Sequence, residues 1–380
     1  MGKWKFQLCL FVMCMFSSCT SSQDVEYRPT PRRTVTPATS NAGGQNPGGV
    51  INPPGQIISG QQGQQGQQGT QPSNQSGNIQ EALASIKQET LKDMVYYLAS
   101  DELQGRGTGE KGNDKAAEYI AKKFEEAGLQ PGKGSSFMQK FDSSQNVVGF
   151  LPGNDPQKKN EVIVIGGHFD HMGNEGGTIY PGADDNASGT SAVVGAAQVL
   201  GRLKGQMRRT LVFIAFTGEE RGLLGSAKYV QDPIFPIKDT HYMINLDMVG
   251  YMDGKSVSLI GGSTSSQAAS LLKKAASEHN LSGDLSGSTD GGSDHANFAE
   301  KNIPVVFFHT GLHENYHQPS DTADKLNYEG LFAITKMATQ FMWELSQDEK
   351  TTQMDGFYLK PPSGFPMLDH GIKEFIKNVR

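Results

Sequence analysis

The chain has 380 residues, a formal net charge of −6 at pH 7 and a pI near 5.9, which argues against a nucleic-acid-binding surface. Its three cysteines, Cys9, Cys14 and Cys19, all lie at the N-terminus, so the rest of the chain can hold no disulfide framework, thiolate zinc site or cysteine nucleophile. Any metal site in the body of the protein must therefore use His, Asp and Glu.

Residues 1–19 predict an export signal: two lysines precede an apolar core over 6–16, and small residues follow. The core is shorter than the about 20 apolar residues of a membrane span. The sequence Phe-Ser-Ser-Cys at 16–19 resembles a bacterial lipobox, with Phe16 where leucine is usual. We expect Cys19 to be acylated and to anchor an exported bacterial lipoprotein on the periplasmic or cell-surface side of a membrane. Ordinary cleavage, giving a secreted protein, is the alternative.

Residues 20–78 predict a disordered tether. The segment has scattered prolines, the repeat GQQGQQGQQG at 60–69 and no apolar periodicity, so it cannot bury enough apolar surface to offset chain entropy. As a flexible chain of about 60 residues it would span roughly 40 Å.

An ordered domain is expected over 79–347. Asn78 is a plausible N-cap with Glu81 three residues later, and apolar spacing predicts a helix from 79 that breaks near Thr90. A second helix is predicted over 114–127, ending at Gly128. Between them, GTGEKG at 107–112 fits a dinucleotide-binding pattern, but it follows a helix instead of a strand, so we interpret it as a turn.

Strands and helices then alternate. Strands are predicted at 145–150, 161–166, 210–216, 241–247 and 304–308, and helices at 189–202, 222–231, 265–279 and 328–346. Strands that are apolar throughout and alternate with helices indicate an α/β fold, a three-layer sandwich with a central, mostly parallel mixed sheet. Residues 348–380 are predicted to form a tail that packs on the domain.

Polar side chains gather where the predicted strands end. In open α/β sheets, ligands bind outside the carboxyl ends of the strands. Without a cation, so many converging carboxylates would repel one another, and imidazole with carboxylate is a donor set that suits zinc. Two histidines shared among at least three carboxylates point to two metal ions. The residues are His168, Asp170, Asp184, Asp185, Glu219, Glu220, Asp247, Tyr316 and His317.

Over residues 85–347 the sequence resembles the co-catalytic zinc aminopeptidases of bacterial secreted type, whose relatives include glutamate carboxypeptidases and glutaminyl cyclases. The motifs that carry the resemblance appear in family order: GGHFDHMG, PGADDNASGT, FTGEERGLLGS, NLDMVG, SDHANFAEKNIPVVFF and NYHQPSDT. It implies a zinc-exopeptidase-like fold, two zinc ions and peptide substrates with a free N-terminus.

The resemblance also implies a role for each matched residue. Asp185 would bridge the two zinc ions, one of which would also bind His168 and Asp247, and the other Glu220 and His317. Glu219 would be the general base, Tyr316 would stabilise the tetrahedral intermediate, and the Asp170 carboxylate would orient His168. A cis peptide bond is expected between Asp185 and Asn186.

Other functions on this scaffold stay open. They are glutaminyl cyclisation, which in the related enzymes uses one zinc, carboxypeptidase or deacylase activity on the same metal centre, and a non-catalytic binding lipoprotein. Four further residues are open between a place at the site and a structural role: His171, Asp294, His295 and His313.

Overall fold

The computed structural model describes residues 78–290 and 292–355. The predicted signal, Cys19 and almost all of the predicted tether lie outside the described residues. The α-helices are α1 (Ile79–Ala84), α2 (Gln88–Leu98), α3 (Lys111–Glu126), α4 (Gly189–Gly201), α5 (Leu224–Gln231), α6 (Ser266–Glu278), α7 (His295–Ala299) and α8 (Tyr328–Gln347). Short helical turns are η1 (Asp101–Arg106), η2 (Ala183–Ser188), η3 (Ile237–Asp239) and η4 (Ala323–Lys325).

The strands form one large sheet and one small hairpin. They are β1 (Gln130–Pro131), β2 (Met138–Phe141), β3 (Ser144–Leu151), β4 (Val162–His168), β5 (Gly173–Glu175), β6 (Thr178–Tyr180), β7 (Thr210–Phe216), β8 (Thr240–Leu246), β9 (Ser256–Ile260), β10 (Ser282–Leu285) and β11 (Val305–His309). The large sheet has the order β1-β3-β7-β4-β8-β11-β9-β10, with β2 paired to β3, and β5 pairs with β6.

The centre of the sheet is parallel. Strand β4 pairs in parallel with β7 and β8, and β8 pairs in parallel with β11. Antiparallel pairs, β3 with β7 and β9 with β11, flank this centre on its two sides. The carboxyl ends of β4, β7, β8 and β11 therefore meet at one edge of the sheet.

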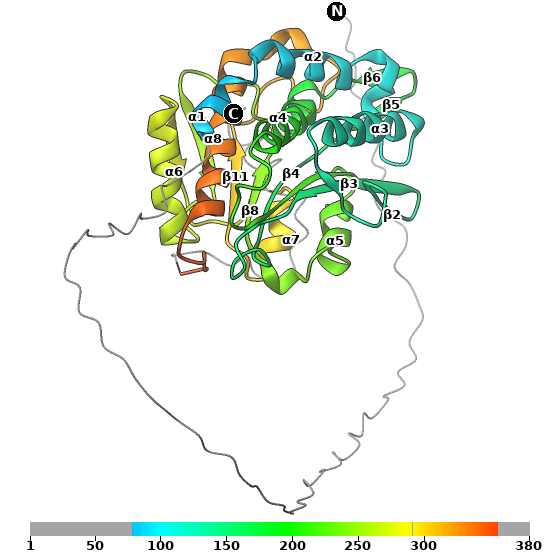
Figure 1. Ribbon diagram of the computed structural model, residues 1–380. Coiled ribbons are helices and arrows are strands. Elements are labelled where there is room, and N and C mark those ends of the chain that lie inside the picture. Colours follow the sequence, from blue (N-terminus) through cyan, green and yellow to red (C-terminus); the bar gives the residue numbers. More distant parts are fainter. Residues whose placement is uncertain (1–77, 291, 356–380) are drawn as a thin grey trace, which may run out of the picture. The chain divides into compact units, whose positions relative to one another are not determined.

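Each face of the sheet packs against its own set of helices (Figure 1). Because side chains alternate along a strand, Ile163 and Ile165 of β4 join the core under α1–α4, α6 and α8, whereas Val162 and Val164 join a smaller core with α5 and α7. Strands β4 and β7 are buried along their whole length. This arrangement confirms the predicted three-layer α/β sandwich.

The predicted elements of the core are confirmed with small shifts at their ends. Asn78 caps α1, its Oδ1 accepting the N–H of Glu81 at 3.2 Å. The break in the first helix falls at 85–87 instead of at Thr90, and the helix predicted from 114 begins at Lys111. In the large sheet, β1, β2, β9 and β10 were not predicted, because they are short, lie at or near the edges of the sheet and are only partly buried.

Beyond α8, residues 348–355 run along the domain. The buried guanidinium of Arg209 donates hydrogen bonds to the carbonyls of Leu345, Asp348 and Lys350 at 2.7–2.8 Å, which ties the end of α8 and the segment after it to the start of β7. The rest of the predicted tail, 356–380, lies outside the described residues.

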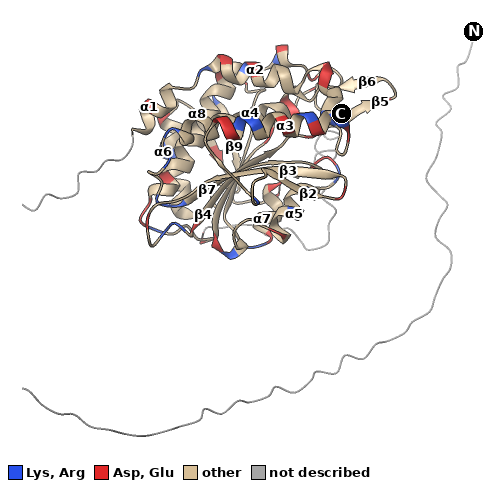
Figure 2. Cartoon of the chain, turned by 45° about the vertical axis from the view of Figure 1, so that its right-hand side comes forward, with Lys and Arg blue, Asp and Glu red and all other residues tan. Residues whose placement is uncertain are grey.

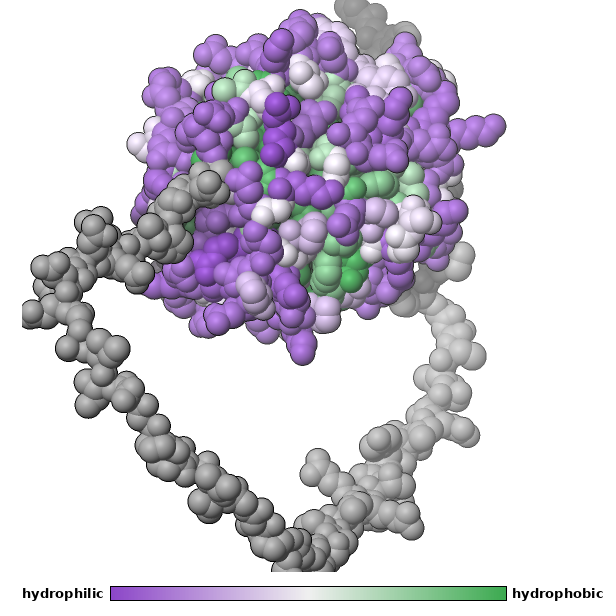
Figure 3. Space-filling model, in the orientation of Figure 1, coloured by the Kyte–Doolittle hydropathy of each residue, from purple (hydrophilic) through white to green (hydrophobic). Residues whose placement is uncertain are grey.

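The surface of the domain is polar. Acidic and basic side chains are interspersed along outer helices such as α3 (Figure 2), and the face seen in Figure 1 is mainly hydrophilic with small apolar areas (Figure 3). Within the described residues, no helix has the length and apolar character needed to cross a bilayer.

Candidate metal centre

The predicted site residues converge at the carboxyl edge of the parallel strands. His168 is the last residue of β4, and Asp247 follows β8 directly. Glu219 and Glu220 follow β7 after a turn at Gly218, whose φ of +77° lies in the left-handed region that favours glycine. Asp185 lies in η2, and His317 comes from the loop after β11.

One part of the site is centred on His168, and we call His168, Asp247 and Oδ1 of Asp185 the His168 half. The Nε2 atom of His168 lies 3.2 Å from Asp185 Oδ1 and 3.3 Å from Asp247 Oδ1. The Oε2 atom of Glu219 is farther from the same nitrogen, at 4.0 Å. The His168 side chain is 1% exposed, so this half is built inside the protein.

The other part is centred on His317, and we call His317, Glu220 and Oδ2 of Asp185 the His317 half. The Nε2 atom of His317 lies 3.1 Å from Asp185 Oδ2 and 3.2 Å from Glu220 Oε2. The two oxygens of Asp185 therefore face two different histidines. The His317 side chain is 34% exposed, so this half opens towards solvent.

The donor atoms fit zinc. In a tetrahedral site with bonds of about 2.0–2.2 Å, two ligand atoms lie about 3.3–3.5 Å apart. The four nitrogen–oxygen distances, 3.1–3.3 Å, are close to that spacing. Asp247 Oδ1 is buried and, among the described residues, accepts no hydrogen bond. A buried acceptor of this kind needs a partner, and a cation would supply one.

The electrostatics show the same demand for positive charge. Burial alone would lower the pKa of His168, but the charges of Asp247 and Glu219 outweigh it and raise the pKa well above its ordinary value. For His317, burial is outweighed by hydrogen bonds with Asp185 and Glu220, which raise the pKa to about 10. Without a metal, the neighbouring carboxylates thus favour the protonated, positively charged form of both imidazoles. Metal binding would release the additional proton.

Glu219 differs from Glu220 in its surroundings. Burial raises the pKa of Glu219 well above its usual range, and the charges of Glu220, Asp247 and Asp294 add to the effect. Both carboxylate oxygens of Glu220 lie near histidines, one 2.7 Å from His171 and one 3.2 Å from His317. The two adjacent glutamates therefore face different groups.

The loop that carries Asp185 is fixed by its backbone. The peptide bond between Asp185 and Asn186 is cis, which confirms that expectation. The Asp321 carboxylate accepts the N–H groups of Asp184 and Asp185 at 3.0–3.1 Å. The Asp184 carboxylate in turn accepts the N–H of Gly250 at 2.7 Å and contacts His313 Nε2 at 3.0 Å.

Asp170 contacts His168 mainly through its backbone. Its carbonyl oxygen lies 3.1 Å from His168 Nδ1, whereas its carboxylate is 3.7 Å away. The carboxylate instead accepts the Thr108 hydroxyl at 2.7 Å and the N–H of Glu219 at 3.3 Å. Asp170 therefore links the strand end that carries His168 to the turn that carries Glu219.

Tyr316 lies beside His317, and the two rings stack with their centroids 3.8 Å apart. Burial raises the pKa of Tyr316, and the charges of Asp185 and Glu220 raise it further. The phenol therefore stays protonated at neutral pH and can donate a hydrogen bond.

Several residues with no role assigned from the sequence support the site. Ser293 donates a hydrogen bond to Asp247 Oδ2 at 2.7 Å, and the backbone N–H of His171 donates to the carbonyl oxygen of Arg106. The buried Arg106 side chain donates to the carbonyls of Leu98, Phe169, Pro181 and Gly182. Only position in the fold could reveal these contacts, because serine and arginine carry no metal-ligand signature.

The four residues left open are now placed. His171 contacts Glu220, and His313 contacts Asp184. Burial raises the pKa of Asp294 to about 7 and lowers the pKa of His295 to about 4, so burial shifts both groups towards their neutral forms. All four lie in or directly behind the site.

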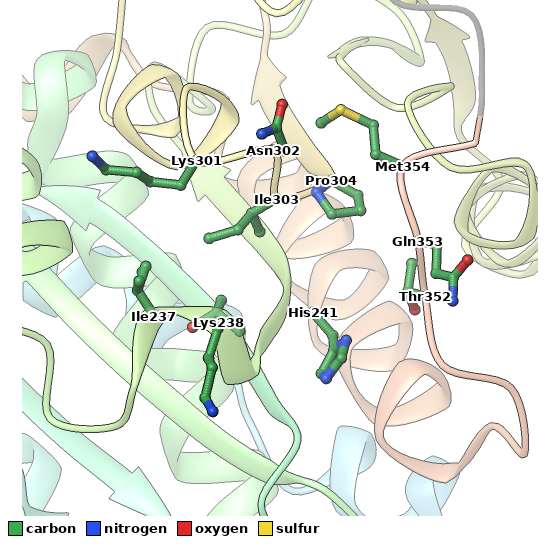
Figure 4. Close-up of a pocket in the computed structure, with 11 residues that line it drawn as sticks. Ile237, Lys238, His241, Lys301, Asn302, Ile303, Pro304, Thr352, Gln353 and Met354 are labelled. Atoms are coloured by element: carbon green, nitrogen blue, oxygen red, sulfur yellow. The ribbon is translucent and has the colours of Figure 1, made fainter. Parts of the chain in front are cut away.

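A separate pocket of about 380 Å³ lies at the other end of the strands (Figure 4). Its lining includes Thr240, the first residue of β8, and Pro304, which precedes β11. His241 and Lys301 also line it, whereas the metal centre is built at the carboxyl ends of the same strands. This pocket is therefore distinct from the site.

The chain is similar in sequence to known aminopeptidases. Over 217 residues the chain is 30% identical to aminopeptidase YwaD of Bacillus subtilis, covering 55% of this chain and 46% of that protein. Over 201 residues it is 29% identical to a probable leucine aminopeptidase of Arthroderma otae, covering 50% and 56%. The chain thus spans about half the length of these curated relatives.

The fold has solved counterparts. The LapA aminopeptidase of Legionella pneumophila aligns with a TM-score of 0.60 and 26% identity, over 72% of this chain and 75% of that one.

The family model described as "Peptidase family M28" matches residues 146–342, which include every residue of the two halves of the site. The chain belongs to peptidase family M28.

Proposed function

We propose that the protein is a zinc-dependent aminopeptidase that binds two zinc ions and removes the N-terminal residue from peptides. The observation that carries the proposal is Asp185, whose two oxygens lie 3.2 Å from His168 and 3.1 Å from His317. A carboxylate shared between two imidazole–carboxylate groups is a natural bridge between two metal ions. Membership of a peptidase family and similarity to proteins named aminopeptidases support the reaction.

The His168 half would hold one zinc ion through His168, Asp247 and Asp185. The His317 half would hold the other through His317, Glu220 and Asp185. Bound zinc ions would supply Lewis-acid polarisation of the scissile carbonyl and would lower the pKa of a water molecule. The remaining work falls to side chains of the chain itself.

Glu219 is our general base. It lies 4.0 Å from His168, beyond the ligand spacing of the other carboxylates, and burial raises its pKa, which suits a group that has to take up a proton. It would take a proton from the attacking water and return it to the leaving amine. Asp170, which accepts the Glu219 N–H at 3.3 Å, would keep the turn in place.

Tyr316 is our donor to the oxyanion. Its phenol is held beside His317 by ring stacking and stays protonated, so it can donate a hydrogen bond to negative charge that develops on the carbonyl oxygen. The excess of carboxylates at the site favours a substrate whose α-amino group is positively charged. Hydrolysis is therefore expected at the first peptide bond.

Zinc analysis and paired substrates test the proposal. The purified chain should contain close to two zinc ions and lose activity with a chelator. It should hydrolyse aminoacyl anilides that have a free amino group and leave the N-acetylated ones intact. Equal hydrolysis of both would contradict the aminopeptidase. Ammonia release from N-terminal glutaminyl peptides, with one tightly bound zinc, would indicate the cyclase instead.

We also propose that Cys19 is lipidated and holds the enzyme on the outer side of a membrane. The lipobox-like sequence before Cys19 supports this location. The Cys19→Ser variant should leave the membrane fraction and appear in the soluble fraction with unchanged anilide hydrolysis. If the variant stays with the membrane, the anchor is elsewhere.

A further inference from the structure

His171 is a buried histidine beside the site that the proposed mechanism does not use. Its side chain is fully buried, and its backbone N–H donates to the carbonyl oxygen of Arg106, with nitrogen and oxygen 3.4 Å apart, beside a β-bridge between Gly107 and His171. A Cβ atom at Gly182 would lie 2.5 Å from Cγ of the His171 ring. Gly182 therefore lets the backbone pack directly on the ring, which holds the imidazole in one place.

The ring points one nitrogen at a predicted zinc ligand. His171 Nδ1 lies 2.7 Å from Glu220 Oε1, while its Nε2 is buried and makes no hydrogen bond to any described residue. A proton on Nε2 would be a buried donor without an acceptor, which is costly. The favoured tautomer thus has its proton on Nδ1 and donates it to Glu220.

The distance separates hydrogen bonding from metal binding. Two atoms bound to one tetrahedral zinc lie about 3.3 Å apart. The 2.7 Å between His171 Nδ1 and Glu220 Oε1 is shorter and matches a charge-assisted hydrogen bond. The two atoms are too close to be ligands of the same zinc ion. His171 therefore forms a hydrogen bond with the ligand Glu220 and does not bind the metal itself.

The contact divides the work between the two oxygens of Glu220. Oε1 is taken by His171, and Oε2 is left 3.2 Å from His317. The His168 half has a parallel arrangement, in which Ser293 occupies Asp247 Oδ2 and leaves Oδ1 3.3 Å from His168. In each half, one polar neighbour fixes a carboxylate so that a single oxygen faces the centre.

We propose that His171 is a positioning residue that holds Glu220 as a one-oxygen zinc ligand of the His317 half. The inference rests on the proposed function, because it concerns how strongly one of the two zinc ions is bound. Hydrogen-bond partners of metal ligands typically contribute about 10–100-fold to metal affinity. The His317 half needs such support because its histidine is 34% exposed.

Two amide substitutions test the donor position. The amide nitrogen of His171→Asn can occupy the place of Nδ1, whereas that of His171→Gln corresponds to Nε2 and points away from Glu220. We would strip the full chain of metal and titrate zinc against a competing chelator. His171→Gln should raise one of the two zinc dissociation constants about 10–100-fold. Both dissociation constants of His171→Asn should stay within about threefold of the wild-type values.

Controls assign the effect to one half. Ser293→Ala should raise the dissociation constant of the zinc ion in the His168 half. A variant that combines His171→Gln with Ser293→Ala should therefore bind both zinc ions more weakly. His279→Phe, on the far pair α6 and α8, where His279 contacts Gln340, should change neither constant. Unchanged constants in His171→Gln, or equal losses in the Asn and Gln variants, would overturn the role of His171.

A direct measurement covers the case in which the Gln variant does not fold. In ¹⁵N-labelled, zinc-loaded wild type, His171 should show a slowly exchanging Nδ1–H proton, and detection of the proton on Nε2 would refute the proposal. The wild-type chain tests the proposed function separately from the role of His171. If it binds zinc and cleaves aminoacyl anilides with a free amino group, the proposed function stands whatever the His171 variants show. If that chain does neither, the proposed function fails together with this inference.

Discussion

The two halves of the candidate metal centre are built differently. His168 ends a strand that is paired on both sides, and its side chain is 1% exposed. His317 lies in a loop with φ of +54° and is 34% exposed. That loop is held by side chains, such as His313 against Asp184 and Asn315 against Tyr251. The sheet thus fixes one half, and a network of hydrogen bonds fixes the other.

The largest effect should come from removing what the halves share. In Asp185→Ala, both histidines lose a carboxylate partner, so we expect both zinc ions to be lost and anilide hydrolysis to fall to background. Elemental analysis and activity assays measure this. Retention of two zinc ions in a folded variant would show that Asp185 is no bridge.

The next comparison separates the two adjacent glutamates. Glu219→Gln removes the proposed base but no proposed ligand, so turnover should fall about 10²–10⁴-fold with both zinc ions retained. Glu220→Gln should also reduce the zinc content, by loss from the His317 half. The same metal content in both variants would contradict this division.

Tyr316→Phe removes one hydrogen-bond donor and leaves the ring stacked on His317. We expect kcat to fall by roughly 10²-fold, with little change in KM, as for loss of one oxyanion donor. Steady-state kinetics on a free aminoacyl anilide would show this. A change confined to KM would instead assign Tyr316 to substrate binding.

A smaller effect should distinguish the supports of the two halves. His313→Ala removes the contact between the His317 loop and Asp184, so one zinc ion should bind about tenfold more weakly. The other should keep its affinity, because His168 is held by the sheet. Stopped-flow chelation should show one faster phase, and acceleration of both phases would mean that the loop supports the whole centre.

The smallest effect is the pH dependence of the metal-free chain. The pKa of His317 is raised to about 10 in the folded protein, against an ordinary value near 6.5. The resulting stability is complete below about pH 6.5 and is lost as pH rises towards 10. Because His317 is partly exposed, we expect a difference of only a few degrees in Tm. His317→Gln should flatten this part of the curve, and an identical slope would contradict the assignment.

Much of the fold follows from the sequence. The central strands are continuous apolar runs, so their position and length show in the sequence, and each begins and ends within two residues of its predicted bounds. The edge strand β10 and its neighbour β9 are short and only partly buried, and their pattern resembles that of a loop. Their pairing comes from their neighbours in the sheet, which no local pattern records.

The site shows the same division. Residues that bear a metal-type side chain at a strand end, such as His168 and Asp247, could be predicted from type and position. The contacts of Asp170 could not, because its backbone carbonyl, and not its carboxylate, lies nearest to His168. The contacts of Ser293 with Asp247 and of His171 with Glu220 could not be predicted either. Which oxygen of a carboxylate has a hydrogen-bond partner depends on the three-dimensional packing around it.

The buried Arg106 has a consequence for how small an active fragment of this protein can be. It joins Leu98, at the end of α2, to the backbone around Phe169 and Gly182, next to the residues predicted to hold zinc. Both Arg106 and Leu98 precede residue 146, where the family match begins. A fragment cut to the matched residues would contain every proposed ligand but would leave the carbonyls of Phe169, Pro181 and Gly182 without their donor. The minimal unit that can hold the proposed metal centre should therefore include Arg106 and the end of α2.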